Sequence, residues 1–235
     1  MKVIAITGST GGMGQNLCTR LAQKGDVALA LCSNQAEQLD AQVKMLAETY
    51  NVPVYGAAFD IFDEEPVAAF FNTVEEKFGK VDVLFNLAGL SIPTKMETVK
   101  GEDFDLMYDV NVKGTLIASK HYALHAVEKG GLIVNIGSQA ARKANGNAPL
   151  YCTAKAAVNM LSTAMQIQLA EKDIRVTTLN PGGADTTFWG TRAVDRSKLM
   201  SAQDVVDVML FVLDHPQMIF YSVDFESATR VALIK

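Results

Sequence analysis

Cysteine, histidine and tryptophan are scarce in this sequence: the 235 residues include three cysteines, three histidines and one tryptophan. An odd number of cysteines with no Cys-x-x-Cys pair argues against a disulfide framework and fits a reducing compartment. His121 and His125 are four residues apart on a predicted helix, but no acidic or thiol partner stands at a matching spacing. We therefore expect no metal site.

A basic excess is also missing, since the formal net charge is -5. Proteins that bind nucleic acids through phosphate neutralisation carry a basic patch or excess, so we expect no nucleic-acid partner. The apolar run at residues 3–6 is too short for a signal segment or a membrane span. We expect a cytoplasmic protein with no membrane partner.

No internal repeat, low-complexity tract or linker divides the chain, so residues 1–235 are expected to form one domain. Short runs rich in Val, Ile and Leu alternate with longer helical patterns, as in repeated βαβ units. The predicted strands are 2–7, 27–33, 54–59, 81–86, 131–137, 174–180 and 219–225, and the predicted helices are 14–24, 35–49, 64–78, 103–128, 150–171 and 202–214. The pattern predicts an α/β, Rossmann-type doubly wound fold, with a seven-stranded parallel sheet flanked by helices on both faces.

Residues 183–201 lack a clear periodicity and contain the sole tryptophan, Trp189. The segment lies between a predicted strand and a predicted helix, and aperiodic segments of this length often close over an active site. We predict a substrate lid here, with an ordinary surface loop as the alternative.

The first predicted strand leads into a glycine-rich turn at residues 7–14, and a helical pattern follows at once. Glycines allow the backbone to turn sharply and to approach a pyrophosphate, whose charge is stabilised by the N-terminus of the helix. At the first strand-to-helix junction of a βαβ series, this turn predicts a dinucleotide site.

Tyr151 and Lys155 are four residues apart on a predicted helix. Six tyrosines and fifteen lysines in 235 residues would give about 0.4 such pair by chance, so the spacing alone is a weak signal. Ser138 stands thirteen residues upstream, at the end of a predicted strand. A phenol, an ammonium and a hydroxyl together can protonate a carbonyl oxygen when a cofactor supplies the hydride. Since residues i and i+4 of a helix share a face, the charge of Lys155, together with that of an oxidised nicotinamide, should lower the pKa of Tyr151.

Together these motifs resemble the short-chain dehydrogenase/reductase family in its compact single-domain form. The matching residues are Thr7, Gly8, Gly12, Met13 and Gly14 in the turn, Asn86-Leu87-Ala88-Gly89 at a strand end, Asn180-Pro181-Gly182, and the set Asn111, Ser138, Tyr151 and Lys155. The resemblance covers about residues 1–190. Leu87 departs from the family pattern, which has a second Asn there.

The resemblance implies a catalytic tetrad. Tyr151 would act as general acid or base, Ser138 would hydrogen-bond the substrate oxygen, Lys155 would hold the nicotinamide ribose, and Asn111 would position a water behind Lys155. Asp60 would bind the adenine, and Asn86 would hold the central strands together. The implied cofactor-binding residues are Gly8, Ser9, Thr10, Gly12, Met13, Gly14, Ser33, Asn34, Asp60, Ile61, Asn86, Ala88, Gly89, Tyr151, Lys155, Pro181, Gly182, Gly183, Ala184 and Thr186.

The choice of nicotinamide cofactor depends on the end of the second predicted strand. NAD enzymes place a carboxylate there to bind the ribose 2′-hydroxyl, whereas Cys32 and Ser33 occupy those positions here. Ser9, Thr10, Ser33 and Asn34 are able to hydrogen-bond a 2′-phosphate, although no Lys or Arg stands nearby. We favour NADP as the cofactor, with NAD as the alternative.

The substrate should lie among residues 90–96, 139–149 and 183–195, which follow the strands that carry the tetrad. Arg142, Lys143 and Arg192 are candidates for binding a carboxylate or phosphate, with solvated surface charges as the alternative. We expect a small carbonyl or alcohol substrate.

One branch of the family, the 3-oxoacyl-carrier-protein reductases, docks its acidic partner with two basic residues, and Lys129 and Lys172 stand at the matching positions. The C-terminal residues 221–227 lack the Asp-Gly-Gly of that branch and look more like small reductases of ketones and 3-hydroxy acids. An acyl carrier protein therefore remains an alternative partner.

Family analogy also implies a homotetramer or homodimer that pairs helices 103–128 and 150–171. A dinucleotide-binding sensor without turnover is a further alternative, which a broken tetrad would favour. A nucleotide-sugar epimerase needs a longer C-terminal domain than 235 residues allow. Cys152 has no activating His and is expected to pack rather than to react.

Overall fold

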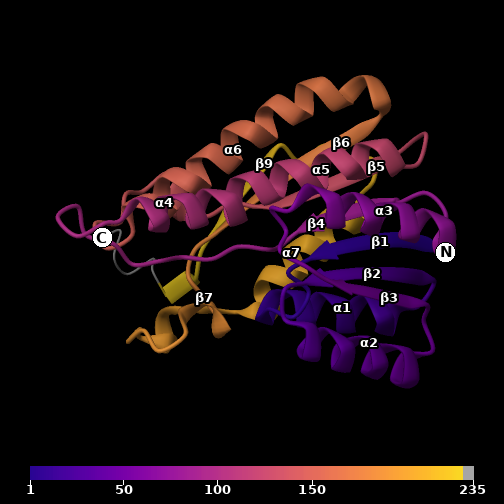
Figure 1. The fold of residues 1–235 in the computed structure, drawn as a ribbon, viewed down its shortest axis with the longest axis horizontal. Helices are drawn as coiled ribbons and strands as arrows, with labels where there is room; N and C mark the ends of the chain where they lie inside the picture. Colours follow the sequence, from indigo (N-terminus) through magenta and orange to yellow (C-terminus); the bar gives the residue numbers. More distant parts are fainter. Residues whose placement is uncertain (230–235) are drawn as a thin grey trace.

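We describe residues 1–229 of the chain in a computed structural model (Figure 1). The strands of the main sheet are β1 (Lys2–Thr7), β2 (Val27–Ser33), β3 (Val54–Ala58), β4 (Val83–Asn86), β5 (Gly131–Ile136), β6 (Ile174–Pro181) and β9 (Ser222–Phe225). The helices are α1 (Gly12–Lys24), α2 (Ala36–Tyr50), α3 (Glu64–Phe78), α4 (Gly101–Tyr108), α5 (Gly114–His125), α6 (Pro149–Leu169) and α7 (Ala202–Asp214).

Within residues 1–229, seven parallel strands form one sheet in the order β3-β2-β1-β4-β5-β6-β9. Strands β2 and β3 are added on one side of β1, and β4 and the later strands on the other side. The order of strands therefore reverses between β1 and β4, which is the switch point where ligands bind in doubly wound folds. Strand β2 is buried along its whole length, as expected of a parallel sheet covered on both faces. The predicted Rossmann-type fold is confirmed.

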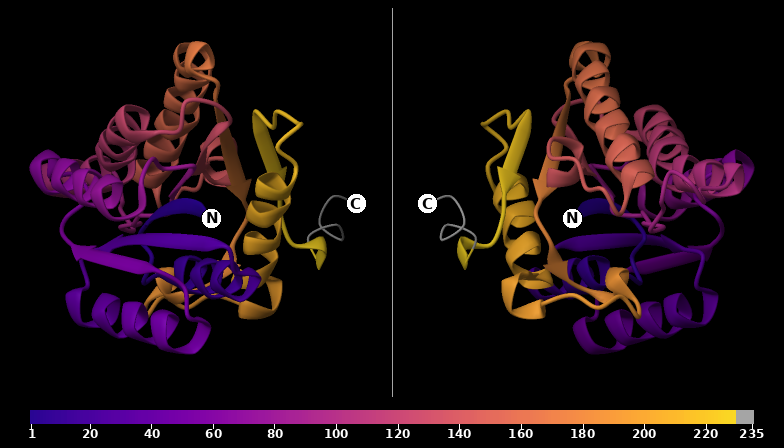
Figure 2. Two further views of the ribbon diagram at one scale, coloured as in Figure 1. Left: turned by 90° about the vertical axis from the view of Figure 1, so that its right-hand side faces the viewer. Right: turned by 90° about the vertical axis from the view of Figure 1, so that its left-hand side faces the viewer.

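Helices cover both faces of the sheet (Figure 2). Because side chains alternate along a strand, Ile4 and Ile6 of β1 pack in one core with α1, α2 and α7. Val3 and Ala5 point the other way and pack in a second core with α3, α5 and α6. The two cores fix the sheet from both sides and leave its carboxyl edge free for a site.

Several element bounds differ from the sequence prediction. The predicted helix 103–128 is interrupted by a π-helical segment, Asp109–Lys113, between α4 and α5, and it ends at His125. The predicted strand 81–86 begins only at Val83, and the predicted strand 219–225 only at Ser222. A π segment is a single wider turn that holds one extra residue, and the hydrophobic periodicity of the sequence does not reveal it.

The predicted lid has structure of its own. Its ends pair in parallel as β7 (Ala184–Asp185) and β8 (Met200–Ser201), with short 3₁₀ turns at Thr187–Trp189 and Arg196–Lys198 between them. Sequence reasoning missed these two strands because two residues are too few for an alternating pattern. The pair ties both ends of the segment to the body beside α7.

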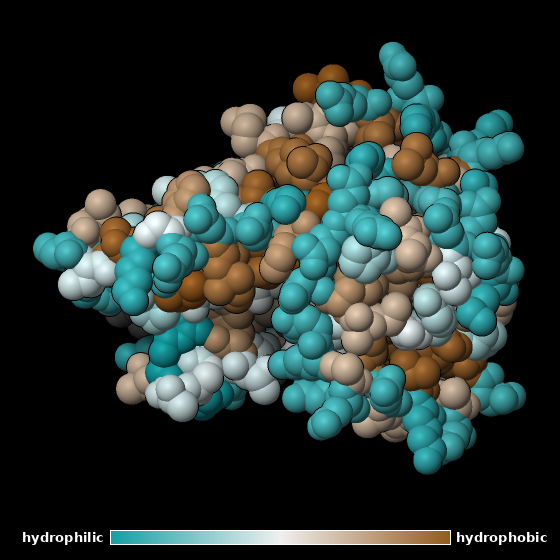
Figure 3. Space-filling view, in the orientation of Figure 1, coloured by the Kyte–Doolittle hydropathy of each residue, from teal (hydrophilic) through white to brown (hydrophobic). Residues whose placement is uncertain are grey.

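No helix in residues 1–229 has the length and apolar character that crossing a membrane requires. Exposed apolar side chains gather on α4, α5 and α6, and Figure 3 shows hydrophobic residues over these helices among hydrophilic ones. They are Phe104, Leu106, Leu116, Leu124, Met160 and Ile167. The pairing of these helices between subunits stays a prediction.

Candidate active site

A cavity of about 740 Å³ opens at the carboxyl edge of the sheet. It is lined by the turn after β1, the ends of β2, β4, β5 and β6, the start of α6 and the lid. This edge lies on the left in Figure 1, beneath the first turns of α6 and beside β7. The cavity therefore meets the switch point that the sheet order creates.

The turn between β1 and α1 is too tight for a side chain at Gly8 or Gly14. Gly8 has a φ of 64°, in the left-handed region, and a Cβ on Gly14 would stand 2.5 Å from the carbonyl oxygen of Gly8. Helix α1 begins at Gly12 with no side-chain cap and no acidic residue in its first turn. Its free N–H groups and positive dipole end suit a phosphate.

Lys155 is buried, with 4% of its surface exposed, and its Nζ donates a hydrogen bond to the carbonyl oxygen of Ile136 at 2.9 Å. Burial lowers the pKa of Lys155 to about 8, because the charged form loses its hydration. The ammonium lies 5.7 Å from the centroid of the Tyr151 ring, on the same face of α6. The helical spacing thus brings the two side chains together.

Tyr151 faces Ser138 across the cavity wall. Burial raises the pKa of Tyr151 to about 12, while a side-chain hydrogen bond with Ser138 and the charge of Arg192 lower it. The prediction joins the charge of Lys155 to that of an oxidised nicotinamide; in the protein alone, burial outweighs the lowering influences on this pKa, and Lys155 is not among them. The phenol therefore holds its proton at neutral pH.

Asn111 lies on the π segment and is fully buried, outside the cavity lining. Its Nδ2 donates to the carbonyl oxygens of Leu90 and Met107 at 3.0 and 2.9 Å. Its Oδ1 has no hydrogen-bond partner among residues 1–229. A Cβ on Gly89 would lie 2.9 Å from this oxygen and 3.4 Å from Lys155 Nζ, so both polar atoms face the same space beside Gly89. The water predicted behind Lys155 has a fitting acceptor here.

The end of β2 is polar and carries no charge. Thr10 Oγ1 lies 2.6 Å from Ser33 Oγ and donates to Gln35 Oε1 at 2.9 Å. Asn34 Nδ2 donates to Asp60 Oδ1 at 3.1 Å. Gln35, which sequence reasoning missed, lines the cavity at the position just before α2. Its place directly after Ser33 and Asn34 was the available signal.

Eighteen of the predicted cofactor-binding residues line the cavity, and two do not. Ser9 is buried, and its hydroxyl donates to Gln42 Oε1 at 3.0 Å. Asn86 donates to Ser119 Oγ and Asn135 Oδ1 at 3.0 and 2.8 Å, and so ties β4 to α5 and β5. The Ser9 hydroxyl and the Asn86 amide nitrogen are thus bonded inside the protein, and neither residue lines the cavity.

Arg192 bonds to the backbone within residues 183–201. Its Nε donates to the carbonyl oxygen of Trp189 at 2.9 Å, and its Nη2 donates to that of Phe188. The guanidinium stacks 5.2 Å from the Phe188 ring and 5.1 Å from the Trp189 ring. Phe188 in turn lies 5.6 Å from the ring of Tyr151. Sequence reasoning missed Phe188, although an aromatic residue inside a predicted lid is a usable signal.

The other two basic candidates are also paired. Arg142 Nε lies 2.7 Å from Asp224 Oδ1 and its Nη2 donates to Ser222 Oγ at 2.9 Å, so the side chain turns toward β9. Lys143 lines the cavity and lies 3.4 Å from Glu226 Oε1. Cys152 is half-buried and its Sγ accepts a hydrogen bond from the N–H of Asn145.

Lys129 and Lys172 stand at the opposite edge of the sheet from the cavity. Lys129 comes just before β5 and Lys172 just before β6, at the amino ends of these parallel strands. Within one chain they do not flank the active-site mouth. His121 and His125 on α5 pair with Glu64 and Glu75 on α3. Residues 1–229 contain no group of three side chains that could hold a metal ion.

The chain matches the model of the short chain dehydrogenase family over residues 2–197. An uncharacterized oxidoreductase of Staphylococcus saprophyticus is 30% identical over 226 residues, covering 92% of each chain. Among solved structures, an alcohol dehydrogenase of the archaeon Thermococcus sibiricus complexed with 5-hydroxy-NADP has a TM-score of 0.90 at 27% identity, over 97% of each chain. A 3-ketoacyl-(acyl-carrier-protein) reductase of Brucella melitensis complexed with NADH has a TM-score of 0.87 at 27% identity, also over 97% of each chain.

The chain belongs to the short-chain dehydrogenase family, and it is an oxidoreductase that acts on substrates of the CH–OH type. The family resemblance carried by the glycine turn and the tetrad is confirmed.

Proposed function

We propose that this short-chain dehydrogenase transfers a hydride between NADPH and a small, neutral carbonyl compound, with Tyr151 as the general acid or base. The observation that carries the proposal is the meeting of Ser138, Tyr151 and Lys155 in one cavity with the glycine turn. These groups come from β5, α6 and the β1–α1 junction, and the fold aligns them at the switch point.

The residues present fit a nicotinamide dinucleotide. The uncapped start of α1 suits a pyrophosphate, and Gly89 leaves open the space that Asn111 Oδ1 and Lys155 Nζ face. Two similar solved enzymes hold 5-hydroxy-NADP and NADH. A bound reduced nicotinamide supplies the hydride. Lys155, with free N–H groups beyond its bond to Ile136, would hold the nicotinamide ribose.

Tyr151 provides the proton in the reductive direction. Its raised pKa keeps the phenol protonated at neutral pH, so it can donate to the oxygen on which negative charge develops. Ser138 hydrogen-bonds the same oxygen and stabilises that charge. Alcohol oxidation follows the reverse path, with Tyr151 as base.

The end of β2 favours NADP over NAD. Thr10, Ser33, Asn34 and Gln35 present hydroxyl and amide groups at the start of α2, and no carboxylate stands at the position of Ser33. We expect Ser33→Asp to lower NADPH affinity about a hundredfold and to raise NADH affinity, because a carboxylate repels a 2′-phosphate and binds a 2′-hydroxyl. Fluorescence titration with both cofactors measures the change, and tighter NADH binding by the unmodified protein would contradict the assignment.

The substrate end of the cavity favours a neutral, largely apolar carbonyl compound. Phe188 and Trp189 form an aromatic wall, and Arg192 beside them is bonded to their carbonyl oxygens. A carboxylate would recruit Arg192 only by breaking these hydrogen bonds, which costs free energy, whereas Arg142 and Lys143 form exposed ion pairs that contribute little. The lid, residues 183–201, would cover the substrate and exclude water.

A 3-oxoacyl-carrier-protein reductase is the second candidate, favoured by the likeness to the Brucella enzyme. The position of Lys129 and Lys172 at the amino edge of the sheet leaves any docking role to an assembled oligomer, in which their sites would approach another subunit's cavity. A homodimer or homotetramer formed through α4, α5 and α6 remains part of this proposal, as does a cytoplasmic location.

The experiment follows NADPH absorbance with matched pairs of neutral and acidic ketones, such as ethyl acetoacetate against acetoacetate and methyl benzoylformate against benzoylformate. We expect kcat/KM for each ester to exceed that for its acid about tenfold or more. Preference for the acids would overturn the neutral class. Binding of NADPH without turnover of these ketones, 3-oxoacyl thioesters, quinones or steroids would favour the non-catalytic sensor instead.

A further inference from the structure

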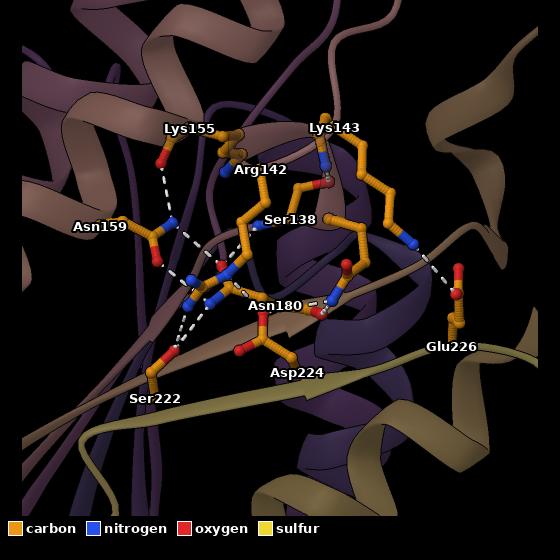
Figure 4. Close-up of polar contacts among 11 residues, drawn as sticks. Ser138, Arg142, Lys143, Lys155, Asn159, Asn180, Ser222, Asp224 and Glu226 are labelled. Atoms are coloured by element: carbon orange, nitrogen blue, oxygen red, sulfur yellow. Dashed lines mark hydrogen bonds and ion pairs between the residues drawn. The ribbon is translucent and has the colours of Figure 1, made fainter.

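Two asparagines that lie behind the catalytic residues form a reciprocal pair. Asn180, at the end of β6, donates from Nδ2 to Asn159 Oδ1 at 3.0 Å, and Asn159, on α6, donates from Nδ2 to Asn180 Oδ1 at 2.9 Å. Asn180 is fully buried and Asn159 is half-buried. Figure 4 shows the pair between Lys155 on one side and Ser222 on the other. A buried carboxamide retains its position only when its polar atoms are bonded, as they are here.

Each asparagine also contacts the backbone of a catalytic residue. Asn180 Oδ1 accepts a hydrogen bond from the N–H of Ser138 at 3.0 Å. Asn159 Nδ2 donates to the carbonyl oxygen of Lys155 at 2.9 Å. Because a backbone N–H only donates and a carbonyl oxygen only accepts, these two bonds fix the orientation of both amides. The pair thus joins the backbone of Ser138 on the β5 side to that of Lys155 on α6.

The contact leaves no room beside Ser138. A Cβ on Gly137 would stand 2.0 Å from Asn180 Oδ1, so the chain approaches the amide closely because residue 137 is glycine. Asn180 Nδ2 also donates to Ser222 Oγ at 3.0 Å, which anchors the pair to the edge strand β9. Besides the bond from Ser138, the Asn180 amide is therefore held by three hydrogen bonds, two with Asn159 and one with Ser222.

We propose that Asn159 and Asn180 are positioning residues, whose paired carboxamides hold Ser138 and Lys155 at a fixed separation so that the Ser138 hydroxyl points at Tyr151. The inference rests on the proposed oxidoreductase reaction. Neither asparagine reaches the substrate itself, since neither lines the main cavity. Their effect passes through the Ser138 side chain, whose hydrogen bond lowers the pKa of Tyr151.

The test compares Asn159→Ala and Asn180→Ala with Asn135→Ala. Asn135 is a matched control on β5, fully buried and bonded to Asn86 and Ser162, but without contact to Ser138. We expect both pair variants to lower kcat about tenfold to a hundredfold with KM changed by less than about threefold, because the Ser138 hydroxyl no longer stabilises the charge that develops on the substrate oxygen. Asn135→Ala should lose thermal stability without lowering the kcat of the folded protein.

The remaining charged and titratable groups near Tyr151 are Lys155 and Cys152 on α6 and Arg192 in the lid, and none is changed by these substitutions. If the pair variants lose activity only in proportion to their folded fraction, with kcat per folded molecule unchanged, the inference is overturned. Asn159→Ala, at the half-buried position, keeps the test open if Asn180→Ala does not fold.

A second measurement separates this inference from the proposed function. Amide hydrogen exchange at Ser138 needs no substrate, and we expect Asn180→Ala to accelerate it about tenfold or more relative to Asn135→Ala, since the N–H loses its acceptor. Unchanged exchange would refute the positioning role even in an active enzyme. If exchange is faster but the parent protein turns over no substrate, the contact between Asn180 and Ser138 is supported and the proposed reaction is not.

Discussion

The two ends of the cavity are held in different ways. At the cofactor end the shape comes from the backbone, because Cβ atoms on Gly8 and Gly14 would lie within 2.7 Å of neighbouring main-chain atoms. At the substrate end it comes from side chains, chiefly Arg192, which donates to the carbonyl oxygens of Phe188 and Trp189. A methyl group added to Gly8 or Gly14 would clash with the backbone, whereas single side chains at the other end can be substituted without moving the backbone.

The difference explains how one scaffold can keep its chemistry and vary its substrate. A dinucleotide binds to N–H groups and a helix dipole, which every sequence with this turn provides. A substrate meets particular side chains on loops, whose loss alters affinity but leaves the sheet intact. Tyr151 stands between the two ends, and substitutions at either end or between them test the comparison.

The largest effect is expected at the residue shared by both ends. Tyr151→Phe removes the proton donor and should lower kcat about a thousandfold, a typical loss for a general acid. Stopped-flow and steady-state measurements of NADPH oxidation give the rate. Fluorescence titration should find the NADPH affinity of the variant within about threefold of that of the parent. A variant that turns over as fast as the parent would remove Tyr151 from the mechanism.

Lys155 lies at the junction and should cost stability at neutral pH. Its pKa is about 8 in the folded protein against an ordinary 10.5, so below pH 8 the folded state holds a buried charge. Lys155→Met should raise the free energy of unfolding by about 3 kcal/mol at pH 7, without cofactor, less whatever the bond to Ile136 contributes.

The pH dependence gives the sign. Between pH 8 and 10.5 the unfolded chain keeps the proton that the folded one has released, so the parent gains stability as the pH rises. The difference between Lys155→Met and the parent should therefore shrink over this range in urea denaturation. A difference that stays constant from pH 7 to 10 would contradict the lowered pKa.

The backbone end is broken by one methyl group. Gly14→Ala places a Cβ 2.5 Å from the carbonyl oxygen of Gly8 and should weaken NADPH binding about a hundredfold, because the turn must open. Gly101→Ala is the control, since a Cβ at the start of α4 meets no atom within 4 Å. Calorimetric titration compares the two, and equal affinities would show that the turn tolerates more than its geometry suggests.

A substitution at the side-chain end should have a smaller effect on activity. Arg192→Gln removes the stacking on Phe188 and Trp189 and should raise KM for the ketone about tenfold, with kcat and NADPH affinity changed by less than about threefold. Arg20→Gln is the control, as it breaks an exposed ion pair with Asp207 between α1 and α7. An equal effect of both substitutions would place the loss outside the lid.

Local pattern was sufficient for most of the sheet and for the glycine turn. Strand β2 is predicted by a run of seven apolar or small residues, and the turn before α1 requires glycines that are visible in the sequence. The bulge at Asn111 and the two-residue strands of the lid were not predictable, since neither leaves a periodic signal.

The fold class, the glycine turn and the spacing of Tyr151 and Lys155 were predictable because each depends on residues close together in the chain. Which polar groups are free to bind depends on contacts between distant residues in the folded protein. The Ser9 hydroxyl, the Asn86 amide nitrogen and the Arg192 guanidinium are able to contact a ligand, but Gln42, Ser119 and the backbone of residues 188–189 already bond to them. The pKa of Tyr151 was likewise set by burial rather than by its neighbour four residues away. Desolvation and long-range hydrogen bonding depend on what the folded chain brings near, and the local pattern does not contain that information.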